Sequence, residues 1–174
     1  RGRGAVGRPA LDREVAKGGY HWIYLDALSD CGSFAVVVIA MVGNAFSPRY
    51  FRARQQKTAA NPIDYSSLHV AVYGPGKGAF AFTERASHDV FRSRDALAFG
   101  ASTLTWETTP SGEDALVVRI HEVTSPFPSL VPKKLQGTVT LVPRHTVDEP
   151  IALDAKGRHM WYCHAPDARV SVPR

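Results

Sequence analysis

The sequence predicts an all-β fold, an antiparallel sandwich or barrel with one short helix. Many short segments alternate apolar and polar side chains with a period of two, which is typical of half-buried strands. Turns that contain glycine or proline separate these segments, and only one stretch has the pattern of a helix. Chains with many short strands form sandwiches or barrels. The length of 174 residues suits a single domain with a sizeable core.

The first predicted elements are two strands and the helix. Residues 20–27 alternate with a period of two and are rich in aromatic side chains, and residues 29–32 have turn chemistry. Residues 34–42 are almost all apolar and β-branched, which is typical of a strand that is covered on both faces. Ser47 suits the N-cap of the helix and Pro48 suits its first position.

The rest of the chain is predicted to consist mainly of short strands. Residues 67–73 and 79–83 form a hairpin around a glycine- and proline-rich loop, and residues 86–94 form a loop or a single helical turn. Three prolines make residues 125–132 an irregular crossing. The remaining predicted strands are 97–99, 104–106, 115–122, 136–142, 151–153, 159–162 and 169–172.

The charge of the chain favours acidic partners. The formal net charge is +5 and the pI is about 9.4, so anionic lipid surfaces are included among these partners. No zinc-finger, RNA-recognition or basic-heptad pattern occurs, so nucleic acid is not expected as a partner. We expect residues 1–17 to form a flexible basic arm and residues 18–174 a single β-rich domain. Arg1, Arg3 and Arg8 are candidate contacts to a partner protein or to lipid, with a solvated tail as the alternative.

Several classes of site lack their sequence signature. No HExxH and no paired Cys/His spacing occurs, so no metal site is expected. A GxSxG elbow is absent, and no GxGxxG motif opens a helix. Cys31 and Cys163 are interpreted as two reduced thiols, with a disulfide as the alternative. The longest apolar run, residues 34–42, is shorter than the ~20 residues of a membrane-spanning helix.

Aromatic side chains form the candidate binding site. Tyr20, Trp22 and Tyr24 lie on one face of the first predicted strand. We predict that they line an elongated apolar pocket, and core packing is the alternative. The aromatic residues that could extend this wall are Tyr73, Phe80, Phe82 and Trp106.

A carboxylate accompanies this aromatic face. Asp26 shares the parity of Tyr20, and a buried carboxylic acid with a raised pKa could act as a general acid. Asp26 is therefore the candidate catalytic residue, although we favour a structural role for it. Asp30, Glu84 and Arg85 are predicted to fix the turns and the mouth of the barrel.

Nine short motifs, in order along the chain, resemble those of one family. They are GGY at 18–20, YLDALSD at 24–30, FSP at 46–48 with Tyr50, VAVYGP at 70–75, TER at 83–85, LDA at 153–155, GRH at 157–159, AP at 165–166 and ARV at 168–170. This set closely resembles the carotenoid hydratase family, also called hydroxyneurosporene synthase. The resemblance runs from about residue 18 to residue 172 and covers the first half of the family's pattern.

The resemblance implies a fold and an activity. Members of the family add water to the terminal double bond of acyclic carotenoids without an organic cofactor, and their lipocalin-like fold has two β-rich halves. The catalytic acid that the family implies belongs to the second half, which follows the matched stretch. The chain departs from the family pattern at Ile23, where a tryptophan is expected, and at Tyr65 and His69.

These departures lead to two functional hypotheses. In the first, the chain is a non-catalytic binding or scaffold subunit, peripherally attached to a photosynthetic membrane beside a pigment–protein complex. In the second, it is the N-terminal part of an active carotenoid hydratase. A lipocalin-like carrier of a carotenoid is a third interpretation. The expected partners are protein subunits of the complex and a carotenoid.

Overall fold

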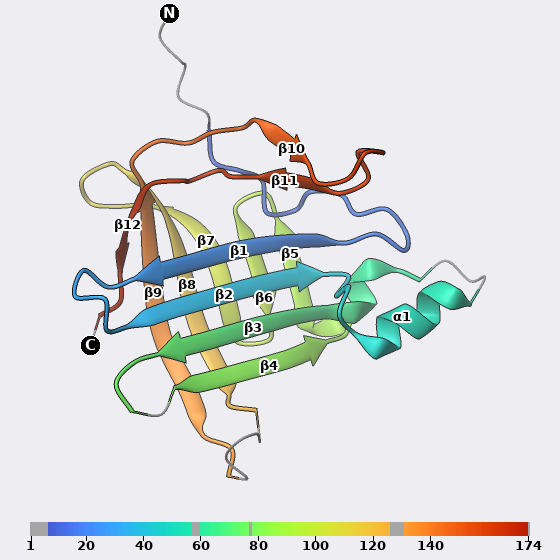
Figure 1. Ribbon diagram of the computed structural model, residues 1–174, viewed down its shortest axis with the longest axis horizontal. Helices are drawn as coiled ribbons and strands as arrows, with labels where there is room; N and C mark the ends of the chain where they lie inside the picture. Colours follow the sequence, from blue (N-terminus) through green and yellow to red (C-terminus); the bar gives the residue numbers. More distant parts are fainter. Residues whose placement is uncertain (1–6, 57–59, 77, 126–130, 174) are drawn as a thin grey trace, which may run out of the picture.

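The computed structural model describes residues 7–56, 60–76, 78–125 and 131–173, which form two packed antiparallel sheets (Figure 1). The front sheet has the order β1-β2-β3-β4, from β1 (His21–Leu28), β2 (Ala35–Val42), β3 (Ser66–Tyr73) and β4 (Ala79–Arg85). The back sheet has the order β12-β9-β8-β7-β6-β5. Its strands are β5 (Val90–Ser93), β6 (Ala96–Phe99), β7 (Ser102–Thr108), β8 (Asp114–Val123), β9 (Lys134–Pro143) and β12 (Ala168–Ser171). The prediction of an all-β sandwich with one short helix is confirmed, and the described strands do not close into a barrel.

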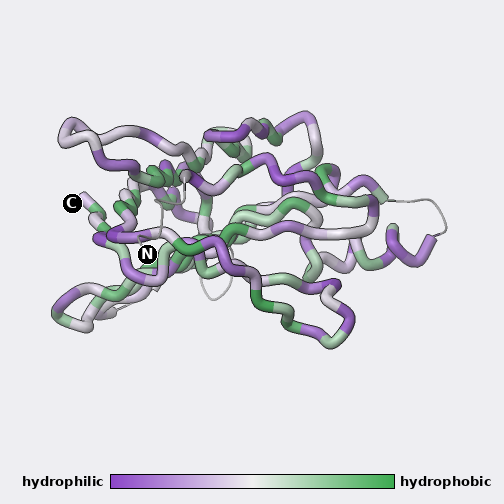
Figure 2. The backbone as a smooth tube through the Cα atoms, turned by 90° about the horizontal axis from the view of Figure 1, so that it is seen from above, coloured by the Kyte–Doolittle hydropathy of each residue, from purple (hydrophilic) through white to green (hydrophobic). Residues whose placement is uncertain are grey.

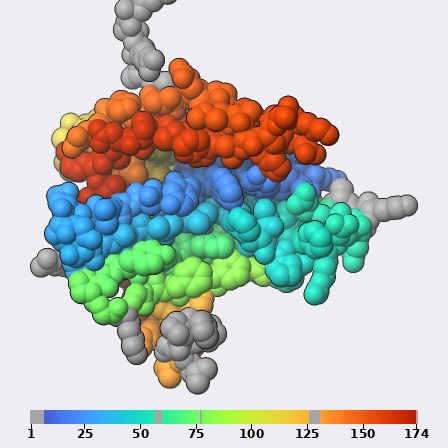
Figure 3. Space-filling view, in the orientation of Figure 1, coloured from blue at the N-terminus to red at the C-terminus, as the bar shows by residue number. Residues whose placement is uncertain are grey.

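The third sheet is a pair of short strands that lies beside β1. It consists of β10 (Pro150–Ala152) and β11 (Met160–Tyr162), which pair only with each other among the described strands. Figures 1 and 3 show this C-terminal segment running along the upper edge of the front sheet. We call residues 144–167, which include these two strands, the strap.

The helix α1 (Pro48–Gln55) begins where the sequence predicts it. The Ser47 hydroxyl accepts a hydrogen bond from the Tyr50 backbone N–H at 3.3 Å, and Pro48 occupies the first position of the helix. Tyr50 is fully buried and anchors the helix to the end of the front sheet. Two short 3₁₀ turns, Pro62–Tyr65 and Ser87–Asp89, precede β3 and β5.

The core lies between the two sheets because each strand of the front sheet directs one parity of side chains toward the back sheet. Leu25, Val38 and Val70 are buried on the inner side of β1, β2 and β3. Phe99 and Val118 meet them from β6 and β8. In Figure 2 the hydrophobic stretches run mainly through the middle of the molecule, and hydrophilic ones gather in end loops and in α1.

A buried carboxylate also links the two sheets. Glu122 on β8 is only 4% exposed and accepts hydrogen bonds from Thr83 on β4 at 2.6 Å and from Ser102 on β7 at 2.7 Å. The Arg85 guanidinium lies 3.4 Å from the same carboxylate. Arg85 therefore acts in the interior between the sheets, whereas Glu84 points to the opposite side of β4 and pairs with Arg49 at 3.8 Å. Asp30 is exposed in the turn between β1 and β2.

The strands agree with the sequence prediction to within about two residues, with three differences. β5 was not predicted, because residues 86–94 were interpreted as a loop or a helical turn. Residues 7–17 do not form a flexible arm, because Leu11 is 3% exposed and belongs to the core. On β1 the parity that faces the core is Ile23, Leu25 and Ala27, not the parity of the aromatic residues.

Some predictions concern residues that lie outside the ranges that the structure describes. Arg1 and Arg3 lie outside the described residues, as does most of the predicted crossing at 125–132. Within the described ranges, no helix combines the length and the apolar character that a membrane crossing requires.

Candidate functional site

A cleft of about 1080 Å³ lies between β1, the N-terminal segment and the strap. Its floor is formed by side chains of the back sheet, including Trp106 on β7, Leu116 on β8 and Leu141 on β9. We call this hollow the aromatic cleft, since six tyrosine and tryptophan side chains from distant parts of the chain line it. These are Tyr20, Trp22, Tyr24, Trp106, Trp161 and Tyr162.

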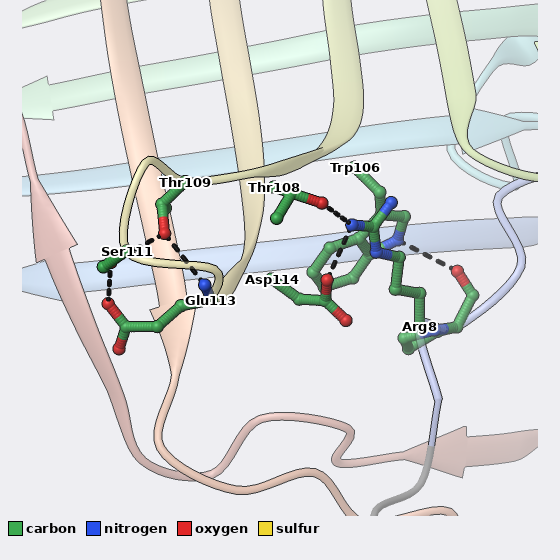
Figure 4. Close-up of polar contacts among 8 residues, drawn as sticks. Arg8, Trp106, Thr108, Thr109, Ser111, Glu113 and Asp114 are labelled. Carbon is green, nitrogen blue, oxygen red and sulfur yellow. Dashed lines mark hydrogen bonds and ion pairs between the residues drawn. The ribbon is translucent and has the colours of Figure 1, made fainter.

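The N-terminal segment, residues 7–19, forms one wall because hydrogen bonds of Arg8, Pro9 and Leu11 tie it to the back sheet. The Arg8 guanidinium contacts the Asp114 carboxylate and the Thr108 hydroxyl, each at 2.6 Å (Figure 4). The Trp106 indole N–H donates to the Pro9 carbonyl at 3.0 Å, and the Leu11 backbone N–H donates to the Arg94 carbonyl at 2.9 Å. Hydrogen bonding to Asp114 raises the pKa of Arg8.

The strap forms the opposite wall, and a contact from Tyr20 fixes it. The Tyr20 hydroxyl lies 2.6 Å from His159 Nδ1, and the two rings stack with centroids 5.6 Å apart. Asp154 shapes the turn before His159, where its carboxylate accepts backbone N–H groups of Lys156, Arg158 and His159. Burial acts to raise the pKa of Asp154, but these three hydrogen bonds outweigh it and the pKa is lowered.

One further contact joins the walls of the cleft, and two more lie within the strap. The Arg13 guanidinium lies over the Tyr162 ring at 4.2 Å, a cation–π geometry that links the N-terminal segment to the strap. Within the strap, the His164 ring stacks on the Tyr162 ring with centroids 5.5 Å apart, and His164 Nδ1 lies 3.1 Å from the Val147 carbonyl oxygen. The strap is thus attached to the body through side chains, because its strands pair with no other described strand.

His21 points from β1 toward the interior of the cleft. Burial lowers its pKa to about 4, and the nearby charges of Arg92, Arg13 and His164 act in the same direction. The imidazole is therefore neutral near pH 7, and the cleft holds an uncharged polar group beside its aromatic walls. This residue was not singled out from the sequence, because its position on the inner parity was not known.

The aromatic side chains that were predicted to line one pocket lie on two separate surfaces. Tyr20, Trp22 and Trp106 line the aromatic cleft. Tyr24 and Asp26 lie at its rim and are exposed, since they project from the outer side of the edge strand β1. Tyr73 and Phe82, together with Phe80, lie on the outer side of β3 and β4, away from the cleft.

The other candidate residues are exposed, half-buried or engaged in a salt bridge. Asp26 is exposed rather than enclosed, so its position lacks the burial on which the catalytic hypothesis depended. Arg8, a candidate partner contact, is engaged with Asp114. Cys31 is exposed and Cys163 is half-buried, and both are free thiols. Within the part of the chain that the structure describes, no cluster of three or more His, Cys, Asp or Glu side chains is placed to hold a metal ion.

Comparison with known proteins places these features in a family. Residues 38–173 match the family described as carotenoid hydratase CrtC. An acyclic carotenoid 1,2-hydratase of Thiocapsa roseopersicina is 36% identical over 164 residues, which cover 94% of this chain and 38% of the relative. The enzyme of the same name from Rubrivivax gelatinosus is 38% identical, over 95% of this chain and 39% of the relative.

A more distant relative also matches this chain. A hydroxyneurosporene dehydrogenase of Chlorobaculum tepidum is 27% identical over 92% of this chain and 44% of the relative. No solved structure matches the chain. The chain spans about two fifths of the length of the curated relatives that it matches. Because the family match covers most of the chain at the identities given, the chain belongs to the carotenoid hydratase family.

Proposed function

We propose that this chain is the N-terminal part of a carotenoid hydratase and that its aromatic cleft holds part of an acyclic carotenoid. The observation that carries the proposal is the cleft itself, about 1080 Å³ in volume and walled by aromatic side chains, in a chain of this family. A polyene is a long apolar ligand, and the side chains of Trp106, Leu116 and Leu141 on the floor of the cleft offer it an apolar surface, although charged side chains also line the cleft. The names of the relatives supply the substrate class.

The reaction proposed for the family requires an acid, a cation and water. Protonation of the terminal alkene gives a tertiary cation, which water captures before it releases a proton. In the described residues, the aromatic faces of the cleft are the groups suited to stabilise a cation. His21, with its pKa near 4, is neutral and is unsuited to donate a proton near pH 7. We assign to this chain the binding of the polyene, and we place the acid outside the described cleft.

Pigment binding tests this proposal. The purified chain is mixed with a detergent solution of an acyclic carotenoid, and bound pigment is followed by visible absorption after gel filtration. We expect pigment to co-elute with the chain and Trp106→Leu to weaken its affinity by about tenfold through loss of aromatic contact. Phe91→Leu, on the exposed side of β5 outside the cleft, is the control and should leave affinity unchanged. Failure of pigment to bind, or equal losses in both variants, would contradict the proposal.

A second candidate function is a non-catalytic scaffold subunit at a pigment–protein complex of a photosynthetic membrane. One observation favours it: the outer side of the front sheet exposes Tyr24, Tyr73, Phe80 and Phe82. A density gradient of gently solubilised native membranes, probed for this chain, tests it. Co-migration with a pigment–protein complex supports the scaffold, and migration apart from every pigmented band contradicts it. Peripheral membrane attachment is part of both candidates.

A further inference from the structure

The outward side of the front sheet is unusually apolar for a surface. The register of β1 to β4 places one parity of each strand on this side, which we call the outer face. Its large apolar side chains are Trp22, Tyr24, Leu28, Val37, Ile39, Met41, Tyr73, Phe80 and Phe82, of which Met41 is fully buried. Tyr24 and Tyr73 are 55% and 56% exposed, and Phe80 and Phe82 are 44% and 39% exposed. A sheet that faced only water would carry mainly polar side chains there.

The strand β2 supports the same conclusion from its sequence. All eight residues of β2 are apolar, a pattern typical of a strand with both faces covered. The back sheet covers the side of Val36, Val38 and Ala40. Figure 3 looks onto the other side, which lies open between the strap and α1. The outer face is therefore built for contact with an apolar partner.

The helix at the end of the outer face is basic and carries exposed aromatic side chains. α1 contains Arg49, Arg52 and Arg54 and no acidic residue. Phe46, just before the helix, is 68% exposed, and Phe51 within it is 59% exposed. Arginine next to exposed aromatic rings is the composition of segments that lie in the interface of an anionic bilayer.

Two contacts make α1 and the outer face one continuous surface. Arg49 pairs with Glu84 on the outer side of β4, at 3.8 Å, so one of the few carboxylates on this surface is neutralised by the helix. The ring of Phe46 stacks on Trp22 of β1 with centroids 6.1 Å apart. Asp26 is the other carboxylate of the strands on this surface, and it is exposed, whereas Glu84 is half-buried. The charged residues of the helix thus give the border of the surface a net positive charge.

The outer face also continues into the aromatic cleft. Trp22, Tyr24 and Asp26 line the rim of the cleft and belong to the outer parity of β1. A ligand that arrived along the outer face would therefore meet the mouth of the cleft. An acyclic carotenoid is a hydrocarbon that partitions into a bilayer rather than into water, so its supply must come from an apolar phase.

We propose that the outer face and α1 dock on an anionic lipid bilayer and open the aromatic cleft toward it. The apolar side chains enter the interfacial region, and the arginines of α1 contact the lipid phosphates. The expectation that docking delivers a carotenoid to the cleft rests on the proposed function. The docking itself depends only on the surface of this chain. Docking should weaken as salt rises, because part of the attraction is electrostatic.

Vesicle sedimentation without any pigment tests the docking. The probes are vesicles of equal parts phosphatidylglycerol and phosphatidylcholine, compared with vesicles of phosphatidylcholine alone. We expect the chain to sediment with the anionic vesicles and Phe82→Ser to lower the affinity by about tenfold. Phe91→Ser, an exposed phenylalanine of β5 on the other sheet, is the matched control and should bind as the unaltered chain does.

The charge on α1 is tested in the same way. Arg52→Glu should weaken binding to anionic vesicles and leave the small binding to phosphatidylcholine unchanged, whereas Lys156→Glu, on the strap, should change neither. Absence of vesicle binding, or equal losses in Phe82→Ser and Phe91→Ser, overturns the docking. A stable dimer that Phe82→Ser dissociates also overturns it, because the outer face would then bind a second copy. Pigment binding in detergent is measured separately, so a chain that binds pigment but no vesicles contradicts only the docking.

Discussion

Glu122 shows how a single buried carboxylate fixes the position of the two sheets. Its carboxylate receives Thr83 and Arg85 from the front sheet and Ser102 from the back sheet. Removal of its charge leaves the half-buried Arg85 guanidinium without its counter-ion and weakens two short hydrogen bonds. Such a group contributes to the relative placement of the sheets as well as to stability.

We predict that Glu122→Gln lowers the free energy of unfolding by about 2–4 kcal/mol, because the partners of the carboxylate stay buried. Urea unfolding measures the change. Glu107→Gln is the control, since Glu107 pairs with Arg119 at 2.6 Å while both side chains are more than two fifths exposed. That change should cost less than about 1 kcal/mol. Equal losses in the two variants would show that burial adds nothing to the role of Glu122.

His21 gives the stability of the chain a dependence on pH. Its pKa of about 4 in the folded chain lies below the ordinary value of 6.5, so the unfolded chain takes up the proton first as the pH falls. The stabilisation is therefore fully present above pH 6.5 and is lost as the pH falls toward 4. Burial and the facing groups Arg92, Arg13 and His164 all favour the neutral imidazole.

As the pH falls, the unaltered chain loses free energy of unfolding because of His21. We predict that this loss is smaller by about 3 kcal/mol in His21→Gln, the value that corresponds to the pKa change. Urea unfolding at pH values above 6.5 and near 4, for the variant and the unaltered chain, measures the difference. His145→Gln is the control, because His145 is exposed on the strap. If the free energy of unfolding of His21→Gln changed with pH as it does in the unaltered chain, the interpretation of His21 as a buried neutral histidine would be contradicted.

Among the elements, the strap depends most on side-chain contacts. β10 and β11 pair with each other and with no other described strand, so Tyr20–His159 and Arg13–Tyr162 hold the strap over the cleft. The sequence predicted both short strands to within about two residues, since alternation and turn residues are local signals. Their position beside β1 could not be predicted, because contacts between residues more than a hundred positions apart leave no periodic pattern.

We predict that Tyr20→Phe loosens the strap without unfolding the sandwich. Loss of the hydroxyl removes the 2.6 Å contact to His159, so backbone amide exchange in residues 150–162 should accelerate by about fivefold to tenfold. Exchange in β2 and β8 should stay as it is. Tyr24→Phe is the control, since Tyr24 is exposed at the rim and makes no contact with His159 in the described structure. Acceleration in both variants, or in β8, would contradict a latch at Tyr20.

For the whole molecule, the all-β class and most strand positions could be predicted, but the faces of the strands could not. On β1 the aromatic parity of Trp22 and Tyr24 is as apolar as the aliphatic parity of Ile23 and Leu25, so hydrophobicity did not decide which parity faces the core. The predicted wall was therefore split between the cleft and the outer face. The N-terminal segment was misjudged because one apolar residue, Leu11, anchors it within a polar stretch.

The two faces of β2 test the whole arrangement, because they differ only in what covers them. Val38 is 1% exposed in the core, whereas its neighbour Val37 is half-buried on the outer face. We predict that Val38→Ala lowers the free energy of unfolding of the isolated chain by about 2–3 kcal/mol and that Val37→Ala lowers it by less than about 1 kcal/mol. Urea unfolding in the absence of lipid measures both. Equal costs would mean that the outer face is already covered in solution, and the sandwich with one open apolar face would not describe the molecule.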